Sequence, residues 1–188
     1  RPDVRGRPRR APRAAACRVK ITFKLFASLA RHLPAGAVRN IVDIDVDATT
    51  YNMDPGHLEA TIEATIKEGR LKPRVVIAVD LFGQPADYPA IKAICDKYGL
   101  KLIADSAQGF GCTLNGDHPI KWADITTTSF FPAKPLGCYG DGGAIFTNDD
   151  TLAQAMREIR VHGQSQRYVH TRVGVGGRMD TLQCAIVL

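Results

Sequence analysis

The sequence of residues 128–137 is TSFFPAKPLG, a stretch that places Lys134 between two prolines directly after a β-branched run. The prolines fix backbone dihedrals on both sides of the lysine, so we expect a stiff loop. Phe130 and Phe131 supply apolar surface, and an ammonium group beside such surface loses solvation, which lowers its pKa. An amine of this kind suits a Schiff base with an aldehyde cofactor. On this loop alone, an ordinary surface lysine is an equally good interpretation.

Strand-like and helix-like patterns alternate around this loop. Apolar or β-branched runs predict strands over residues 75–79, 102–104, 125–128 and 144–147. Helix starts are predicted at Asp54 with Pro55, at Asp87, and at Asp149 or Asp150. The stripes that these helices are expected to bury are Leu58, Ile62 and Ile66; Ile91, Ile94, Cys95 and Tyr98; and Leu152, Ala155, Met156 and Ile159. This rhythm predicts an α/β fold with a mainly parallel sheet and helices on both faces.

The first 20 residues differ in composition from the rest of the chain. They hold eight of the 25 basic and one of the 19 acidic residues, so they carry +7 and the remaining chain carries −1. We expect residues 1–20 to be a disordered basic tail and residues 21–188 to be part of one domain, because the chain ends within an apolar helical pattern. Within that part, residues 21–33 resemble a helix and residues 40–45 a short strand.

Several classes of function are disfavoured by composition. No apolar run approaches the roughly 20 residues of a membrane helix, and no signal peptide is visible. The excess positive charge is confined to the tail, so nucleic-acid binding is not expected. The five cysteines (Cys17, Cys95, Cys112, Cys138 and Cys184) form no Cys-x-x-Cys pair, which argues against a zinc site and a disulfide framework. We therefore expect a cytoplasmic protein with reduced thiols, without a metal and without membrane contact.

Two predicted strands are followed by residues whose side chains could bind or react with a ligand. Asp105 follows one apolar strand directly, and the loop from Ser129 to Lys134 follows the next. Ligands of open parallel sheets bind at the carboxyl ends of the strands, so Asp105 and Lys134 are expected on opposite sides of one small cavity. The pair suits pyridoxal phosphate (PLP), with Lys134 on the aldehyde, Asp105 on the pyridine nitrogen, Gln108 on the ring and Ser129 on the phosphate. Taken singly, Asp105 also reads as a helix cap and Ser129 as a turn residue.

Other polar and glycine-rich segments give weaker signals. Residues 137–143 and 174–177 lack the spacing of a dinucleotide or P-loop fingerprint, and we interpret the first as a tight turn. Arg160, His162 and Arg167 follow the last predicted strand–helix unit, where they are candidates for binding an anionic substrate or are simply solvated surface. Trp122 and Asp124 are interpreted as structural.

The order and spacing of these motifs resemble the DegT/DnrJ/EryC1/StrS family, which comprises sugar-nucleotide aminotransferases with the aspartate-aminotransferase fold (PLP fold type I). The motifs are residues 81–85, 104–108, 128–134, 140–144 and 178–183. The resemblance is strong from about residue 73 and fair from residue 40. Within the family, residues 129–143 and 161–164 are most similar to bacterial UDP-2-acetamido-2-deoxy-hexuluronate aminotransferases, which make diamino-uronic acid sugars for the O-antigen of lipopolysaccharide.

The resemblance implies a role for each matching residue. Lys134 would form the Schiff base and move the proton between substrate and cofactor, while Asp105, Gln108 and Ser129 would hold the ring nitrogen, the ring and the phosphate. Glutamate would be the amino donor, a UDP-linked 3-keto hexuronic acid the acceptor, and a homodimer with shared active sites the assembly.

The chain departs from the family at three places, and two alternatives stay open. An Asn usual near Gly176, an upstream Gly-Thr turn and the carboxy-terminal small domain are not found in the sequence. The alternatives are a PLP enzyme that acts on amino acids, such as a lyase, and a truncated non-catalytic remnant or regulatory relative.

Overall fold

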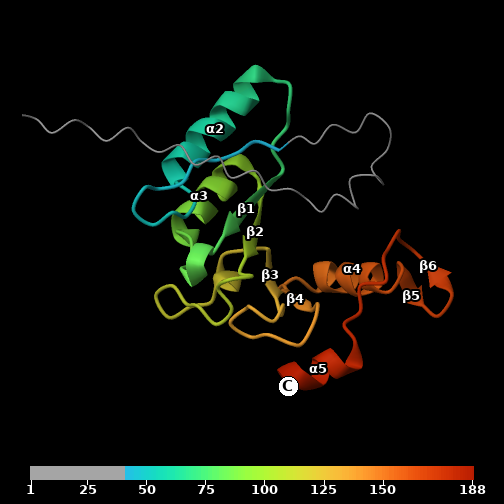
Figure 1. Cartoon of the computed structure of the whole chain (residues 1–188). Helices are drawn as coiled ribbons and strands as arrows, with labels where there is room; N and C mark the ends of the chain where they lie inside the picture. Colours follow the sequence, from blue (N-terminus) through green and yellow to red (C-terminus); the bar gives the residue numbers. More distant parts are fainter. Residues whose placement is uncertain (1–40) are drawn as a thin grey trace, which may run out of the picture.

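The computed structural model describes residues 41–188, so the predicted tail over 1–20 and the predicted helix over 21–33 lie outside the described residues. A four-stranded sheet in the order β1-β2-β3-β4 forms the centre, and a separate two-stranded hairpin, β5-β6, lies to one side of it (Figure 1). No helix within residues 41–188 is long and apolar enough to cross a membrane.

The central sheet confirms the predicted strands and the predicted mainly parallel character. Its strands are β1 (Val75–Val79), β2 (Lys101–Asp105), β3 (Ile125–Ser129) and β4 (Gly143–Phe146). The first three run parallel, with Val79 beside Asp105 and Asp105 beside Thr127. The fourth strand is antiparallel to β3, an orientation that the sequence pattern did not predict.

Helices α2 (Pro55–Glu68) and α3 (Tyr88–Tyr98) begin and end where the caps predict. The Asp54 carboxylate accepts hydrogen bonds from the Gly56 and His57 amides, and the Asp87 carboxylate accepts one from the Ala90 amide at 3.2 Å. Both helices end at a left-handed glycine, Gly69 and Gly99. These caps satisfy backbone groups that the helix ends leave unpaired.

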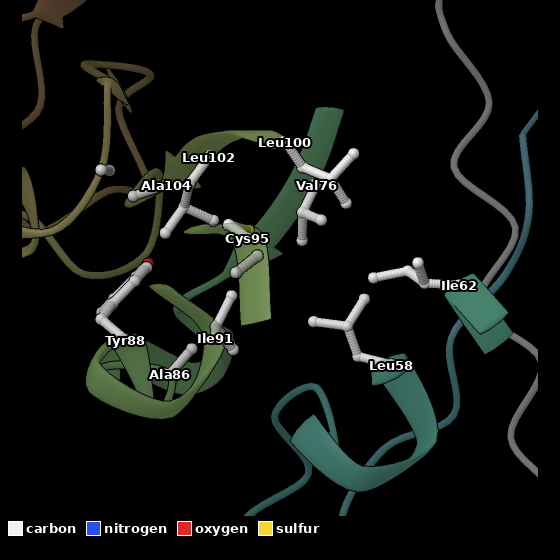
Figure 2. Packing of buried hydrophobic residues seen from close by; sticks show 12 residues of the cluster. Leu58, Ile62, Val76, Ala86, Tyr88, Ile91, Cys95, Leu100, Leu102 and Ala104 are labelled. Atoms are coloured by element: carbon white, nitrogen blue, oxygen red, sulfur yellow. The ribbon is translucent and has the colours of Figure 1, made fainter. Parts of the chain in front are cut away.

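The hydrophobic core lies between these two helices and one face of the sheet. Its buried members are Leu58, Ile62, Val76, Ala78, Ala86, Tyr88, Ile91, Cys95, Leu100, Leu102, Ala104 and Ala123, most of which Figure 2 shows converging from α2, α3, β1 and β2. Each large side chain buried here contributes about 1.5–3 kcal/mol. On the other face of the sheet, Ile77 of β1 stays 50% exposed, so within residues 41–188 this core covers one face.

Helix α4 (Asp150–Arg160) begins at Asp149, whose carboxylate caps the Thr151 and Leu152 amides. It leads into the hairpin of β5 (Gln164–Gln166) and β6 (Val169–His170). Glu158 ties the helix to the segment after the hairpin, because its carboxylate accepts hydrogen bonds from Arg172 at 2.7 Å and Thr171 at 3.0 Å. Bonds from Gln154, Arg172 and Thr171 lower the pKa of Glu158. The predicted terminal helix is α5 (Thr181–Val187).

Three local predictions were wrong. Residues 41–45 form no strand, and only Val46 makes an isolated bridge, to Met53. Ile66 is 51% exposed and Thr65 is buried in its place, because a helix of 3.6 residues per turn brings position i+7 back over Leu58 while i+8 drifts away. Ile159 is 41% exposed for a different reason, since the fixed side chain in its turn of α4 is Glu158.

Candidate active site

Three parallel strands end at one edge of the sheet, and each ends in a polar residue. Asp80 follows β1 directly, Asp105 is the last residue of β2, and Ser129 is the last residue of β3. Asp105 pairs in register with Thr127, so the two side chains lie on the same face of the sheet. Side chains alternate along a strand, so Ser129, two residues after Thr127, lies on that face as well. The carboxylate and the hydroxyl therefore share one edge and one face.

The Lys134 loop connects β3 to β4 and is closed at its base by backbone hydrogen bonds. The Phe130 amide donates to the Gly142 carbonyl and the Cys138 amide donates to the Phe130 carbonyl, both at 2.8 Å. At the tip, the Lys134 amide donates to the Phe131 carbonyl at 2.9 Å, which makes a turn with proline at its second position. The loop is therefore hydrogen-bonded both at its ends and at its tip.

The structure brings Lys134 into direct contact with Gln108. The Nζ atom of Lys134 donates to the Gln108 Oε1 atom at 2.8 Å, across 26 residues of sequence. Asp105 lies at the start of the same turn as Gln108, where its Oδ1 atom accepts the Ala107 amide at 3.1 Å. The Ser129 hydroxyl accepts the Phe131 amide at 3.2 Å at the start of the lysine loop. An amine, a carboxylate, an amide and a hydroxyl are thus gathered on two adjacent turns.

The apolar wall predicted beside the amine is not what the structure shows around Lys134. Phe130 is buried against Phe110 in an edge-to-face contact with ring centroids 6.0 Å apart. Phe131 is 49% exposed. The contact that the amine does make is polar, to an amide oxygen. Phe130 anchors the loop, and the Lys134 amine is held by its contact with Gln108.

The expected small cavity between Asp105 and Lys134 does not coincide with a hollow that the structure shows beside α4 and β4. An open hollow of about 1070 Å³ lies beside α4 and β4, and its walls include Phe110, Ile145, Phe146, Met156 and Arg160. Neither Asp105, Gln108, Ser129 nor Lys134 lines it. At the base of the lysine loop, the backbones of β3 and β4 approach each other closely. A Cβ atom at Gly143 would lie 2.7 Å from the Thr128 carbonyl oxygen.

The three candidate substrate residues lie on the segment from α4 to the β5-β6 hairpin, and Arg160 lines the same hollow as Thr127, Thr128 and Gly143 of this sheet edge. Arg160 ends α4 and lines the hollow, and His162 has a left-handed backbone (φ 58°) beside Gly176. Arg167 is at the tip of the β5-β6 hairpin, where its guanidinium lies 5.0 Å from the centre of the Tyr168 ring. Figure 1 shows that hairpin well away from β1 and β2. Within the part of the chain that the structure describes, none of the three contacts Lys134.

Sequence reasoning missed one residue at this edge, Asp80. It is fully buried, although it sits at the end of an apolar strand in the same way as Asp105. A signal was present, because an acidic residue ending a buried strand needs hydrogen-bond donors to compensate its burial. The structural interpretation of Trp122 was sound, since its ring stacks on Tyr88 with centroids 6.3 Å apart.

The described residues contain four of the five cysteines, and Cys17 lies outside them. Cys95, Cys112, Cys138 and Cys184 are free thiols. Residues 41–188 contain no cluster of three His, Cys, Asp or Glu side chains placed to hold a metal ion.

We expect Gly137→Ala to destabilise the lysine loop. A Cβ atom there would lie 2.8 Å from the Pro132 carbonyl oxygen and 3.0 Å from that of Phe131, and backbone cannot move aside as a side-chain end can. Overpacking of this kind costs about 1–3 kcal/mol, measurable as a lower urea midpoint of unfolding. Gly140→Ala is the matched control, because its new methyl group meets only the flexible end of Gln183. Equal midpoints for the two variants would contradict the close approach at Gly137.

Comparisons with known proteins place the chain among aminotransferases. The sequence pattern of the DegT/DnrJ/EryC1/StrS aminotransferase family matches residues 19–188. A UDP-2-acetamido-2-deoxy-3-oxo-D-glucuronate aminotransferase of Pseudomonas aeruginosa is 54% identical over 147 residues, which cover 78% of this chain and 39% of the relative.

Two solved structures agree with this similarity. A DegT DnrJ EryC1 StrS aminotransferase from Brucella abortus superposes with a TM-score of 0.76 at 48% identity, covering 78% of this chain and 39% of the other. NtdA from Bacillus subtilis, solved with bound cofactor PMP, superposes with a TM-score of 0.65 at 33% identity, covering 77% and 32%. The chain spans about two fifths of the length of the Pseudomonas aeruginosa and Brucella abortus proteins.

Proposed function

The chain belongs to the DegT/DnrJ/EryC1/StrS aminotransferase family, and on that premise we propose that it carries the cofactor lysine of a PLP-dependent sugar-nucleotide aminotransferase. The observation that supports this most directly is the 2.8 Å contact of Lys134 with Gln108, made on the turn that also carries Asp105. Residues 21–188 would then be part of the large, cofactor-binding domain of the enzyme.

The groups at the sheet edge fit PLP by their chemistry. The cofactor offers an aldehyde, a basic ring nitrogen and a phosphate, and the edge offers an amine, a carboxylate and a hydroxyl beside backbone amides. Asp105 would hold the ring nitrogen, Gln108 the ring, Ser129 the phosphate and Lys134 the aldehyde. When bound, PLP supplies an aldehyde for amine exchange and a ring that accepts an electron pair.

The residues of the chain then have separate tasks. The Lys134 amine, held by Gln108, would take a proton from the donor carbon that loses the amino group and deliver a proton to the acceptor carbon that gains it. The Asp105 carboxylate stabilises positive charge at the ring nitrogen by its own negative charge. The hydrogen-bonded loop base keeps the amine at a fixed height above the sheet edge, so that little ordering is left to be done during reaction.

For the substrates we propose glutamate as the amino donor and a UDP-linked 3-keto hexuronic acid as the acceptor, in the synthesis of a cell-surface polysaccharide such as O-antigen. The 54% identity to the Pseudomonas aeruginosa aminotransferase supports this choice. A cytoplasmic homodimer with shared active sites is the proposed assembly. Arg160, His162 and Arg167 remain proposed contacts for the anionic sugar nucleotide. Arg160 shares its hollow with Thr128 and Gly143 of the sheet edge, and we place Arg167 of the exposed hairpin in a site completed by another subunit.

The proposal is tested by supplying the chain with PLP, [15N]glutamate and the UDP-linked 3-keto uronic acid. The expected product is an amino sugar nucleotide whose amine carries 15N, detected by mass spectrometry. A parallel incubation with PLP and amino acids alone separates the lyase alternative. A lyase would release keto acid over many turnovers without the sugar, whereas an aminotransferase would release at most one keto acid for each bound cofactor. A folded chain that neither binds PLP nor labels the sugar would contradict the proposal.

A further inference from the structure

Asp80 is a fully buried carboxylate that accepts hydrogen bonds from four donors. Its Oδ1 atom accepts from the Tyr88 hydroxyl at 2.6 Å and from the Ala86 amide at 3.1 Å. Its Oδ2 atom accepts from the Ser106 hydroxyl and, at 3.7 Å, from the Cys112 thiol. The two oxygens therefore face two different parts of the chain, the start of α3 on one side and the turn after β2 on the other.

The Oδ2 side of Asp80 belongs to the turn that carries the proposed cofactor residues. Ser106 lies between Asp105 and Gln108, and its amide and carbonyl are held by β3 through the Thr127 carbonyl and the Thr128 hydroxyl. The Asp80 amide also donates to the Asp105 carbonyl at 3.0 Å. The carboxylate thus joins the end of β1 to the turn after β2, and β3 holds the same turn through the Ser106 backbone.

Two further observations show how closely the turn is fitted to this carboxylate. A Cβ atom at Gly109 would lie 2.8 Å from the Asp80 Cβ atom, so the turn backbone approaches Asp80 directly. Burial, followed by the Asp80 charge, raises the pKa of Cys112 to about 11 and keeps the thiol protonated as a donor. The Tyr88 side chain points its hydroxyl from α3 towards β2 in Figure 2.

We propose that Asp80 is a positioning residue that holds the turn of residues 106–112 in the shape that presents Asp105 and Gln108 to Lys134. It acts through Ser106 and Cys112 and touches neither cofactor nor substrate. The consequence for PLP rests on the proposed function, whereas the hold on the turn belongs to the chain alone.

Asp80→Asn separates the two sides of the carboxylate. The Ala86 amide can only donate, so the Asn oxygen must face Ala86 and Tyr88, and the Asn NH2 group must face Ser106 and Cys112. The charge-assisted bond to the turn is lost with almost no change in side-chain volume. Tyr88→Phe is the matched control, because it removes a donor from the other oxygen and leaves Ser106 and Cys112 in place.

Amide hydrogen exchange on the cofactor-free chain is the first measurement. In Asp80→Asn we expect the amides of Ala107, Gly109 and Cys112 to exchange at least about tenfold faster relative to those of α3, which report the core. In Tyr88→Phe the ratio of the turn exchange rates to the α3 exchange rates should stay within about threefold of its wild-type value. The proposal would be overturned if this ratio of turn to α3 exchange rates were unchanged in Asp80→Asn. It would also be overturned if the ratio rose equally in both variants.

The second measurement adds PLP. We expect Asp80→Asn to weaken PLP binding at least about tenfold and to shift the pH midpoint of the absorbance of the bound cofactor, while Tyr88→Phe changes neither. A loosened turn with unchanged PLP binding would overturn the link to the cofactor residues. If the wild-type chain binds no PLP, the proposed function fails, and the exchange result still decides whether Asp80 holds the turn.

If Asp80→Asn does not fold, Ser106→Ala removes the same hydrogen bond from the other side. The changes in exchange rate expected for Asp80→Asn then apply to Ser106→Ala.

Discussion

Lys134→Ala is expected to lower amino transfer by about 10²–10⁴-fold, the contribution of one positioned acid–base group, and to abolish covalent attachment of the cofactor. In the wild-type chain, incubation with PLP followed by borohydride should leave a pyridoxyl mass on the peptide that contains Lys134. The variant should leave none. Peptide mapping by mass spectrometry reads the attachment site directly, so the result does not depend on knowing the sugar.

The loss in Lys134→Ala should be chemical and not structural. The lysine side chain makes one exposed hydrogen bond, to Gln108, and a bond of this kind contributes about 0.5–1.5 kcal/mol or less to stability. The urea midpoint of the variant should therefore stay close to that of the wild type. Lys67→Ala, an exposed lysine in the last turn of α2, is the matched control and should keep full labelling. Pyridoxyl label on another lysine, or label retained in Lys134→Ala, would contradict the assignment.

The site was predictable from sequence to the extent that parallel strands impose it. Asp105 and Ser129 each end an apolar or β-branched run, and parallel runs must end at the same edge, so their proximity follows from topology. Gln108 and Lys134 meet for the same reason, since each sits on the turn after one of those strands. Local chemistry also fixed the helix starts, because Asp54 and Asp87 cap without help from distant residues.

The features that sequence reasoning missed depend on partners far away in the chain. In the sequence, Asp80 looks like any acidic residue after a strand. Its role becomes visible only in the structure, where Tyr88, Ser106 and Cys112 donate hydrogen bonds to its buried carboxylate. Glu158 is similar, because its hydrogen-bond partner Arg172 lies 14 residues away in the sequence. The antiparallel direction of β4 likewise follows from the closure of the lysine loop onto β3, which no local pattern encodes.

Asp105→Asn is expected to lower amino transfer by about 10²–10³-fold while leaving the fold intact. The fold should survive because the Asp105 side chain makes one hydrogen bond in the structure, its Oδ1 atom accepting the Ala107 amide, and an asparagine oxygen accepts the same bond. What changes is the charge. An amide cannot stabilise a positive charge at the ring nitrogen of PLP, and removing one electrostatic group of this kind typically costs that factor.

The pH dependence of the bound cofactor separates the charge effect in Asp105→Asn from a displaced turn. Loss of the carboxylate should lower the pH at which the ring nitrogen gives up its proton, because a nearby negative charge favours the protonated form. The absorbance of bound PLP should therefore titrate at lower pH in Asp105→Asn, with wild-type exchange rates at the Gly109 and Cys112 amides. Asp96→Asn, which removes an exposed carboxylate paired with Lys92 on α3, should leave both readings unchanged. An unaltered titration in Asp105→Asn would mean that another group faces the ring nitrogen, and the assignment of the sheet edge would then rest on Lys134 alone.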